Sequence, residues 1–150
     1  MQDTRTVILK MDLHEKSSSR TSQVSAADIA AYQTHLILAL TKPYWESIPS
    51  SYKDYYYSSI AHNLMDPQSG KVEMGIPLNT DMKIFAFLFS GKYSEYELIM
   101  WDREVGYYGE SRSFTIGKQT DSLELGIRLT QATTNTDADT SSAYCDLQPS

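Results

Sequence analysis

The sequence contains one cysteine, no long hydrophobic run and little clustered positive charge. Because Cys145 has no second cysteine to pair with, an internal disulfide is excluded. We interpret this residue as a spectator thiol, with a bond to another chain as the alternative. No apolar run approaches the roughly 18 residues that cross a bilayer, so no membrane-spanning segment is expected. The net charge of −6, without a cluster of Lys and Arg, argues against a nucleic-acid partner.

Catalytic and metal-binding signatures are also missing. The three histidines, His14, His35 and His62, are far apart, and none has a second ligand at a metal-binding spacing. Residues 109–113, Gly-Glu-Ser-Arg-Ser, begin like the nucleophile elbow of serine hydrolases but lack its second glycine. We therefore expect no metal, no cofactor and no enzymatic activity.

The start of the sequence leaves the cellular compartment open. Residues 1–4 are polar and no apolar segment follows them, so the printed sequence shows no secretory signal. The first residues would be the same kind of sequence in a cytosolic protein and in the mature part of an exported protein to which a Met has been added. The composition, 41% hydrophobic and 21% charged, is that of an ordinary folded domain.

The most informative segment that is present is residues 82–90, MKIFAFLFS. Read with the two-residue period of a strand, both of its faces are hydrophobic: Met82, Ile84, Ala86 and Leu88 on one, and Phe85, Phe87 and Phe89 on the other. Such a strand lies in the middle of a sheet and needs cover on each side. We predict that the tyrosine-rich residues 44–57 cover the phenylalanines, with a partner chain as the alternative.

Hydrophobic alternation predicts further strands at residues 6–13, 32–40, 55–64, 71–78, 112–116 and 122–130. Residues 93–101 fit a strand, or a short helix followed by one. A helical turn is expected at residues 26–31, an antiparallel hairpin between residues 55–64 and 71–78, and a loop around Tyr107 and Tyr108.

About seven short strands separated by turn residues indicate a mainly β fold, a single antiparallel β-sandwich of immunoglobulin-like or prealbumin-like type. We expect residues 1–130 to form this domain. Residues 131–150, rich in Ser, Thr and Asp, are expected to be a disordered tail or linker.

Aromatic residues provide the candidate binding residues. Eleven tyrosines occur, several of them clustered, and flat amphipathic rings anchor protein interfaces or stack on sugars. The candidates are Tyr44, Trp45, Tyr52, Tyr55, Tyr57 and Trp101. Three uses of these rings remain open: cover for the sheet, contact with another protein, and a platform for a glycan.

Residues 70–90, GKVEMGIPLNTDMKIFAFLFS, resemble a pattern of prealbumin-like and carboxypeptidase-regulatory-like β-sandwiches of exported bacterial proteins. In that pattern a strand ends in Ile/Leu-Pro, a short turn follows and a strongly apolar strand comes next. The resemblance implies a non-catalytic accessory or adhesive module and assigns no functional residue.

The leading hypothesis is therefore a non-enzymatic β-sandwich module of an exported or surface protein, acting through protein contact in an envelope, adhesin or accessory assembly. A lipoprotein is one form that such a protein takes. The second hypothesis is a carbohydrate-binding module that uses Trp45, Tyr55, Tyr57 or Trp101 as an aromatic platform. The third is a small enzyme of unrecognised type.

Overall fold

The computed structural model describes residues 3–15, 31–47 and 51–131. Its strands and helices are, in chain order, β1 (Thr4–Glu15), β2 (Thr34–Thr41), α2 (Lys42–Glu46), α3 (Tyr52–Ser58), β3 (Ala61–Met65), β4 (Lys71–Pro77), β5 (Met82–Phe89), α4 (Glu95–Met100), β6 (Tyr107–Glu110) and β7 (Ser122–Gln131). Cys145, almost all of the expected tail and almost all of the helical turn expected at residues 26–31 lie outside the described residues.

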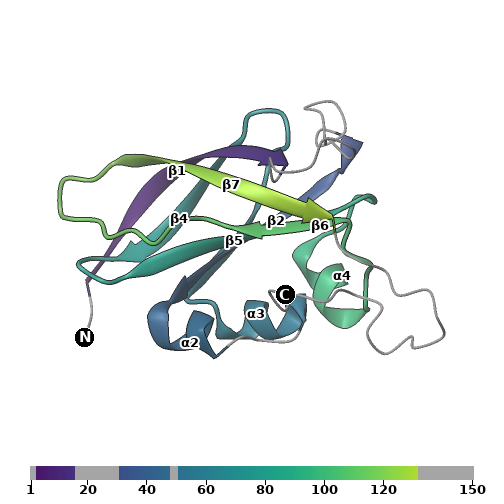
Figure 1. Cartoon of the computed structure of the whole chain (residues 1–150), viewed down its shortest axis with the longest axis horizontal. Coiled ribbons are helices and arrows are strands. Elements are labelled where there is room, and N and C mark those ends of the chain that lie inside the picture. The colour runs from purple at the N-terminus through teal and green to yellow at the C-terminus, as the bar shows by residue number, and fades with distance from the viewer. Residues whose placement is uncertain (1–2, 16–30, 48–50, 132–150) are drawn as a thin grey trace.

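The described strands form one sheet of seven, in the order β3-β2-β5-β6-β7-β1-β4 (Figure 1). Neighbouring strands are antiparallel, except that β1 and β7 are parallel, from Ile8 beside Ser122 onward. The sheet curls until its edge strands approach each other, as in an almost closed barrel. At this seam Asn63 Nδ2, on β3, donates a hydrogen bond of 3.1 Å to the carbonyl oxygen of Glu73, on β4.

The expected mainly β fold is confirmed, but the prediction of a purely antiparallel arrangement is wrong for β1 and β7. The immunoglobulin-like or prealbumin-like sandwich is not confirmed, because the seven strands make one continuous sheet. The physical reason is that alternation reports which face of a strand is buried and not which strand lies beside it. A curled sheet buries its concave face against itself, so the same alternation serves both architectures.

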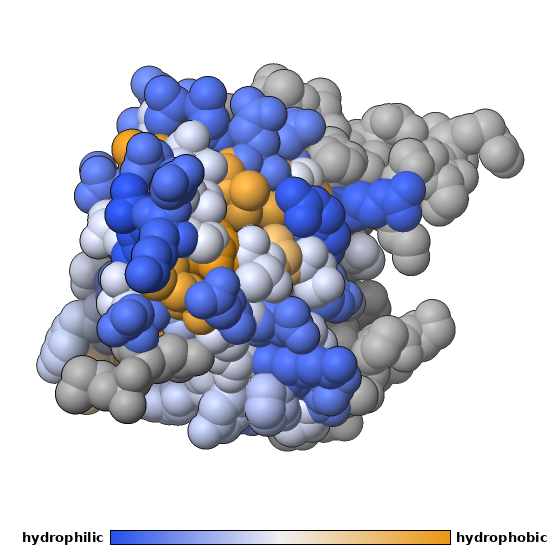
Figure 2. Space-filling view, turned by 90° about the vertical axis from the view of Figure 1, so that its left-hand side faces the viewer, coloured by the Kyte–Doolittle hydropathy of each residue, from blue (hydrophilic) through white to orange (hydrophobic). Residues whose placement is uncertain are grey.

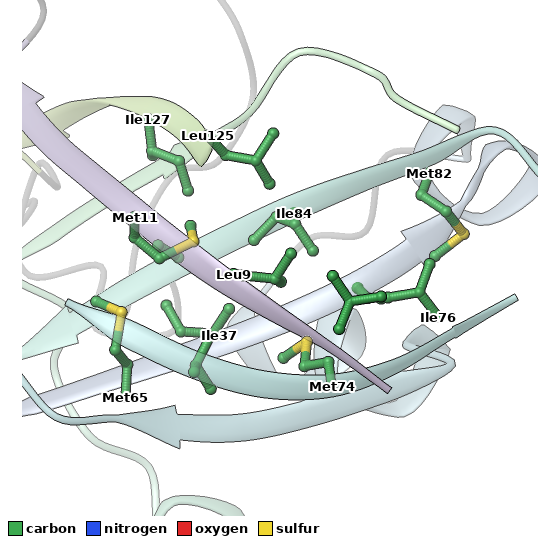
Figure 3. Packing of buried hydrophobic residues seen from close by; sticks show 14 of the residues in the cluster. Leu9, Met11, Ile37, Met65, Met74, Ile76, Met82, Ile84, Leu125 and Ile127 are labelled. Carbon is green, nitrogen blue, oxygen red and sulfur yellow. The ribbon is translucent and has the colours of Figure 1, made fainter. Parts of the chain in front are cut away.

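The concave face of the sheet holds the larger hydrophobic cluster (Figure 3). The inward residues of β1, β4 and β7 supply much of it: Val7, Leu9, Met11, Val72, Met74, Ile76, Leu125, Ile127 and Leu129. Phe114 and Ile116 are also buried there, but the strand predicted at residues 112–116 makes only isolated bridges to Met82 and Leu78. Burying each large aliphatic side chain contributes about 1.5–3 kcal/mol, which makes this cluster the main source of stability.

The opposite face of β5 is covered by α3 and α4, which lie on that side of the sheet (Figure 1). The ring centroid of Tyr55 lies 4.8 Å from that of Phe85, and the ring of Tyr52 lies 5.0 Å from Phe89. All three phenylalanines of β5 are buried. The predicted cover by the tyrosine-rich segment is therefore confirmed, and α4 adds the buried side chain of Leu98.

The strand predicted over residues 55–64 is wrong in its first half, which belongs to α3. Tyrosines favour strands by propensity, but Ser51 caps a helix here, its hydroxyl accepting a hydrogen bond from the backbone N–H of Asp54 (3.3 Å). Tyr52 and Tyr55, three residues apart, then share the buried face of α3.

The predicted hairpin between residues 55–64 and 71–78 is also wrong, although its turn is present. Gly70 takes a positive φ of 68° and its N–H donates to the carbonyl of Asp66 (3.0 Å). The strands on either side of this turn pair elsewhere, β3 with β2 and β4 with β1, and they occupy opposite edges of the sheet.

The loop expected around Tyr107 and Tyr108 is strand β6, which lies between β5 and β7. Gly109, next to Tyr108, favours a turn by residue type but lies within this strand. A Cβ on Gly109 would lie 2.2 Å from the carbonyl oxygen of Arg128, on β7, so only glycine allows the two strands to approach this closely.

Candidate functional site

The structure divides the six predicted aromatic candidates between core and surface. Tyr52 and Tyr55 are buried in the cluster between the helices and β5, and Trp45, on α2, is partly buried against it. Tyr44, on α2, Tyr57, on α3, and Trp101, which follows α4, are exposed. These exposed rings come from three separate segments of the chain.

Most of the large hydrophobic side chains that are exposed in the described residues lie on the helices. There are seven, and all but Ile8 lie on the helices or directly beside them: Tyr44, Tyr57, Ile60, Tyr96, Met100 and Trp101. The helices α2, α3 and α4 lie on the same side of the sheet (Figure 1). We call these helices, with residues 59–60 and 101–105, the helical layer.

A second face of the molecule also carries exposed hydrophobic residues (Figure 2). This view, onto the left-hand side of Figure 1, shows a hydrophobic area framed mainly by hydrophilic residues.

Helix α4 presents the most compact group of exposed rings in the helical layer. Tyr96 and Met100 are four residues apart and so lie on one helix face, and they are 65% and 54% exposed. Trp101 is 53% exposed, and its ring meets that of Tyr96 edge to face, with 6.2 Å between centroids. We call Tyr96, Met100 and Trp101 the α4 patch.

Sequence reasoning found Trp101 but missed Tyr96 and Met100. The available signal was Ser94 followed three residues later by Glu97, the signature of a capping box. In the structure Ser94 Oγ accepts from the N–H of Glu97 (3.2 Å), and Glu97 Oε1 accepts from the N–H of Ser94 (2.9 Å). Within residues 93–101 the structure therefore has the short helix α4, residues 95–100, and no strand follows it in residues 101–105.

The backbone beneath the α4 patch is fixed to the core by one buried hydroxyl. The hydroxyl of Tyr52 donates to the carbonyl oxygen of Leu98 (2.6 Å) and lies 3.2 Å from that of Trp101. It also accepts a hydrogen bond from the N–H of Arg103 (3.2 Å). These contacts hold the end of α4 in one place relative to the sheet.

Arg103 further restricts the rings around the patch. The carbon atom at the centre of its guanidinium lies 4.4 Å from the ring centroid of Tyr93 and 5.8 Å from that of Trp101. At these distances a cation is attracted to the face of an aromatic ring. Arg103 Nε is buried without a hydrogen-bond partner, so the planar group is held mainly by the rings.

A polar link joins α3, β3 and α4. His62 Nδ1, on β3, lies 2.6 Å from Glu95 Oε1, and the hydroxyl of Tyr56 donates to the same oxygen at 3.4 Å. The rings of Tyr56 and His62 are 4.4 Å apart. Partial burial raises the pKa of Tyr56 above its usual 10.0, and the negative charge of Glu95 raises it further.

The groups with catalytic potential have structural partners. Ser111, from the motif at residues 109–113, accepts a hydrogen bond from the N–H of Ile84 (2.9 Å) and donates to the carbonyl of Arg112 (2.7 Å). His35 is buried on β2. The residues that the structure describes contain no group of three or more His, Cys, Asp or Glu able to hold a metal ion.

None of the described helices is long and apolar enough to cross a membrane.

No protein-family model and no curated protein matches the chain. Two solved structures are similar to it. One is the fimbrial anchor protein Mfa2 from Porphyromonas gingivalis, with 13% identity and a TM-score of 0.44, covering 86% of this chain and 51% of that one. The other is a fimbrial assembly protein from Parabacteroides distasonis, with 8% identity, a TM-score of 0.43 and coverage of 88% and 54%. The chain thus spans about half the length of each, and similarity of this degree assigns it no function.

Proposed function

We propose that this chain is a non-enzymatic module of an exported surface or envelope assembly and that it works by protein contact through the helical layer. The observation that supports this proposal is the position of the exposed apolar side chains. All but one of those in the described residues belong to the helical layer. Aromatic rings and methionine are enriched in protein interfaces. Tyrosine and tryptophan rings also bury much area and lose little conformational freedom.

The alternative of a glycan platform lacks a comparable observation. Of the four rings that the sequence suggested for it, Tyr55 is buried, and Trp45 is partly buried with Lys83 Nζ 5.4 Å from its ring centroid. Tyr57 and Trp101 belong to different segments, α3 and the end of α4. Protein contact therefore explains more of the exposed surface.

The exported location rests on the resemblance of residues 70–90 to β-sandwiches of exported proteins. It is tested by labelling intact cells that express the full chain with a membrane-impermeant amine reagent. Exposed lysines such as Lys71 and Lys118 should react, as should those of a known surface protein, while a cytosolic protein should not. Labelling that appears only after lysis would contradict an exported location.

Protein contact is tested by site-specific photo-crosslinking in the same cells. A photoreactive phenylalanine analogue is placed at Tyr57 or at Tyr96, both in the helical layer, or at Ile8, which is exposed on β1. We expect one discrete crosslinked protein from the helical-layer positions and none from Ile8. Crosslinking that is equal at all three positions, or absent from both tyrosines, would overturn the proposal.

A further inference from the structure

Met100 differs in its exposure from the other methionines that the structure describes. It is 54% exposed and ends α4, where it belongs to the α4 patch. The other four are at most 8% exposed and lie in the concave cluster, where Figure 3 labels them: Met11, Met65, Met74 and Met82. A dissolved oxidant reacts with a thioether that it can reach, so this difference in exposure predicts a difference in reactivity.

The backbone beside Met100 keeps its side chain on the solvent side of α4. The hydroxyl of Tyr52 donates to the carbonyl oxygen of Leu98 (2.6 Å), and the N–H of Trp101 donates to that of Glu97 (3.2 Å). Leu98 is fully buried and occupies the side of α4 that faces the core. Because residues two apart on a helix do not share a face, Met100 points away from the core while these contacts hold.

Peroxides are the oxidants that suit an exposed thioether. The lone pair of the Met100 sulfur attacks one oxygen of hydrogen peroxide, and the S–O bond forms as the O–O bond breaks and hydroxide leaves. The proton on the transferred oxygen passes to the hydroxide, so the products are methionine sulfoxide and water. The sulfur is oxidised and the peroxide is reduced. This reaction turns an apolar side chain into a polar one, a change that disrupts interfaces containing methionine.

The position of Met100 gives this change a consequence for the α4 patch. Met100 is the only thioether among the exposed apolar side chains of the helical layer. It shares a helix face with Tyr96 and precedes Trp101, whose ring meets that of Tyr96. A partner that covers these rings also covers the sulfoxide oxygen, and burying a polar group without a hydrogen bond is unfavourable.

We propose that Met100 is a site of modification by peroxide and that its oxidation to the sulfoxide weakens protein contact through the α4 patch. This inference rests on the proposed function and adds regulation to it, since it names the residue whose chemistry changes the contact surface.

The first measurement uses the purified full chain. It is treated with hydrogen peroxide for increasing times, digested and analysed by mass spectrometry. We expect Met100 to gain one oxygen at least about tenfold faster than the four methionines of the concave cluster, which become accessible only when the core opens. Oxidation of any of those four at the same rate as Met100 would overturn the inference.

The second measurement uses the cells of the crosslinking experiment, with the photoreactive analogue at Tyr96. Treatment with hydrogen peroxide before irradiation should oxidise Met100, as mass spectrometry of the recovered chain will show. The crosslinked product should fall at least about fivefold, because the sulfoxide is unfavourable to bury. Met100→Leu has no sulfur at this position, so its crosslink yield should be the same with and without peroxide.

The matched control combines Met100→Leu with Ile8→Met, which places a thioether at an exposed position on β1, outside the helical layer. This variant should be oxidised at residue 8, and its crosslink from Tyr96 should not respond to peroxide.

Three results in cells contradict the inference: Met100 that is not oxidised, oxidised Met100 with an undiminished crosslink, or an equal loss of the crosslink in Met100→Leu. All three leave the proposed function standing, because the crosslinks of untreated cells are unaffected. Absence of crosslinks from untreated cells removes the proposed function, and the weakening with it, whereas the selectivity of oxidation is still measured on the purified chain.

Discussion

The hydroxyl of Tyr56 shows how a single side chain makes the stability of this protein depend on pH. Burial raises its pKa, and the neighbouring carboxylate of Glu95 raises it further. The neutral phenol is thus favoured in the folded state. The stabilisation is fully present below the unfolded-state pKa of 10.0, and it is lost as the pH rises through the higher folded-state pKa.

We therefore expect the natural chain to lose more stability than Tyr56→Phe between pH 9 and pH 11. The measurement is the free energy of unfolding in urea at each pH. The contribution of the other ten tyrosines cancels in the difference between the two proteins. Tyr44→Phe, at an exposed position on α2, is the control and should follow the natural chain. If the free energy of unfolding changed equally with pH in Tyr56→Phe and in the natural chain, the raised pKa of Tyr56 would be contradicted.

Helix α4 has only six residues, and it depends on its cap and on one buried side chain. Helices of this length are not stable alone, so contacts at the ends and with the core decide whether they form. Because Ser94 and Glu97 satisfy each other's backbone N–H groups, the capping box determines where the exposed rings of the α4 patch begin.

Replacing Ser94 with Ala should lower the free energy of unfolding by about 0.5–2 kcal/mol. The loss should be local, with faster amide exchange in α4 and unchanged exchange in β5, because short surface elements open without the core. Ser113→Ala, at an exposed serine outside the helices, is the matched control. Unchanged exchange in α4 would show that burial of Leu98 and the hydrogen bonds of the Tyr52 hydroxyl hold the helix without its cap.

At the level of the whole molecule, the sequence predicted burial better than it predicted neighbours. The two hydrophobic faces of β5 correctly required two covers, and the tyrosine-rich residues 44–57 were correctly expected to be one of them, although not as a helix. The parallel pairing of β1 with β7 was missed because alternation within a strand contains no information on its partner. The α4 patch was found only in part, because Tyr96 and Met100 are recognised as neighbours on one face only after the short helix that contains them is known.

The seam between β3 and β4 is the least connected part of the almost closed sheet. Consecutive strands elsewhere in the sheet share backbone ladders, whereas Asn63 bridges this seam by donating from its side chain to the carbonyl of Glu73. Sheet edges left unpaired tend to open first or to pair with other chains. The Asn63 side chain therefore contributes to closure of the whole sheet.

Asn63→Ala should remove this link and also the hydrogen bond that Asn63 Oδ1 accepts from the N–H of Leu64 (2.9 Å). The free energy of unfolding should fall by about 0.5–1.5 kcal/mol for each hydrogen bond lost. Amide exchange should become faster in β3 and β4 and remain slow in β5 and β6, which lie inside the sheet. Gln68→Ala, at an exposed position in the turn between β3 and β4, tests whether any polar-to-Ala change nearby has the same effect. If Asn63→Ala and Gln68→Ala behave alike, the seam is closed by packing of the two edge strands and not by the Asn63 hydrogen bond.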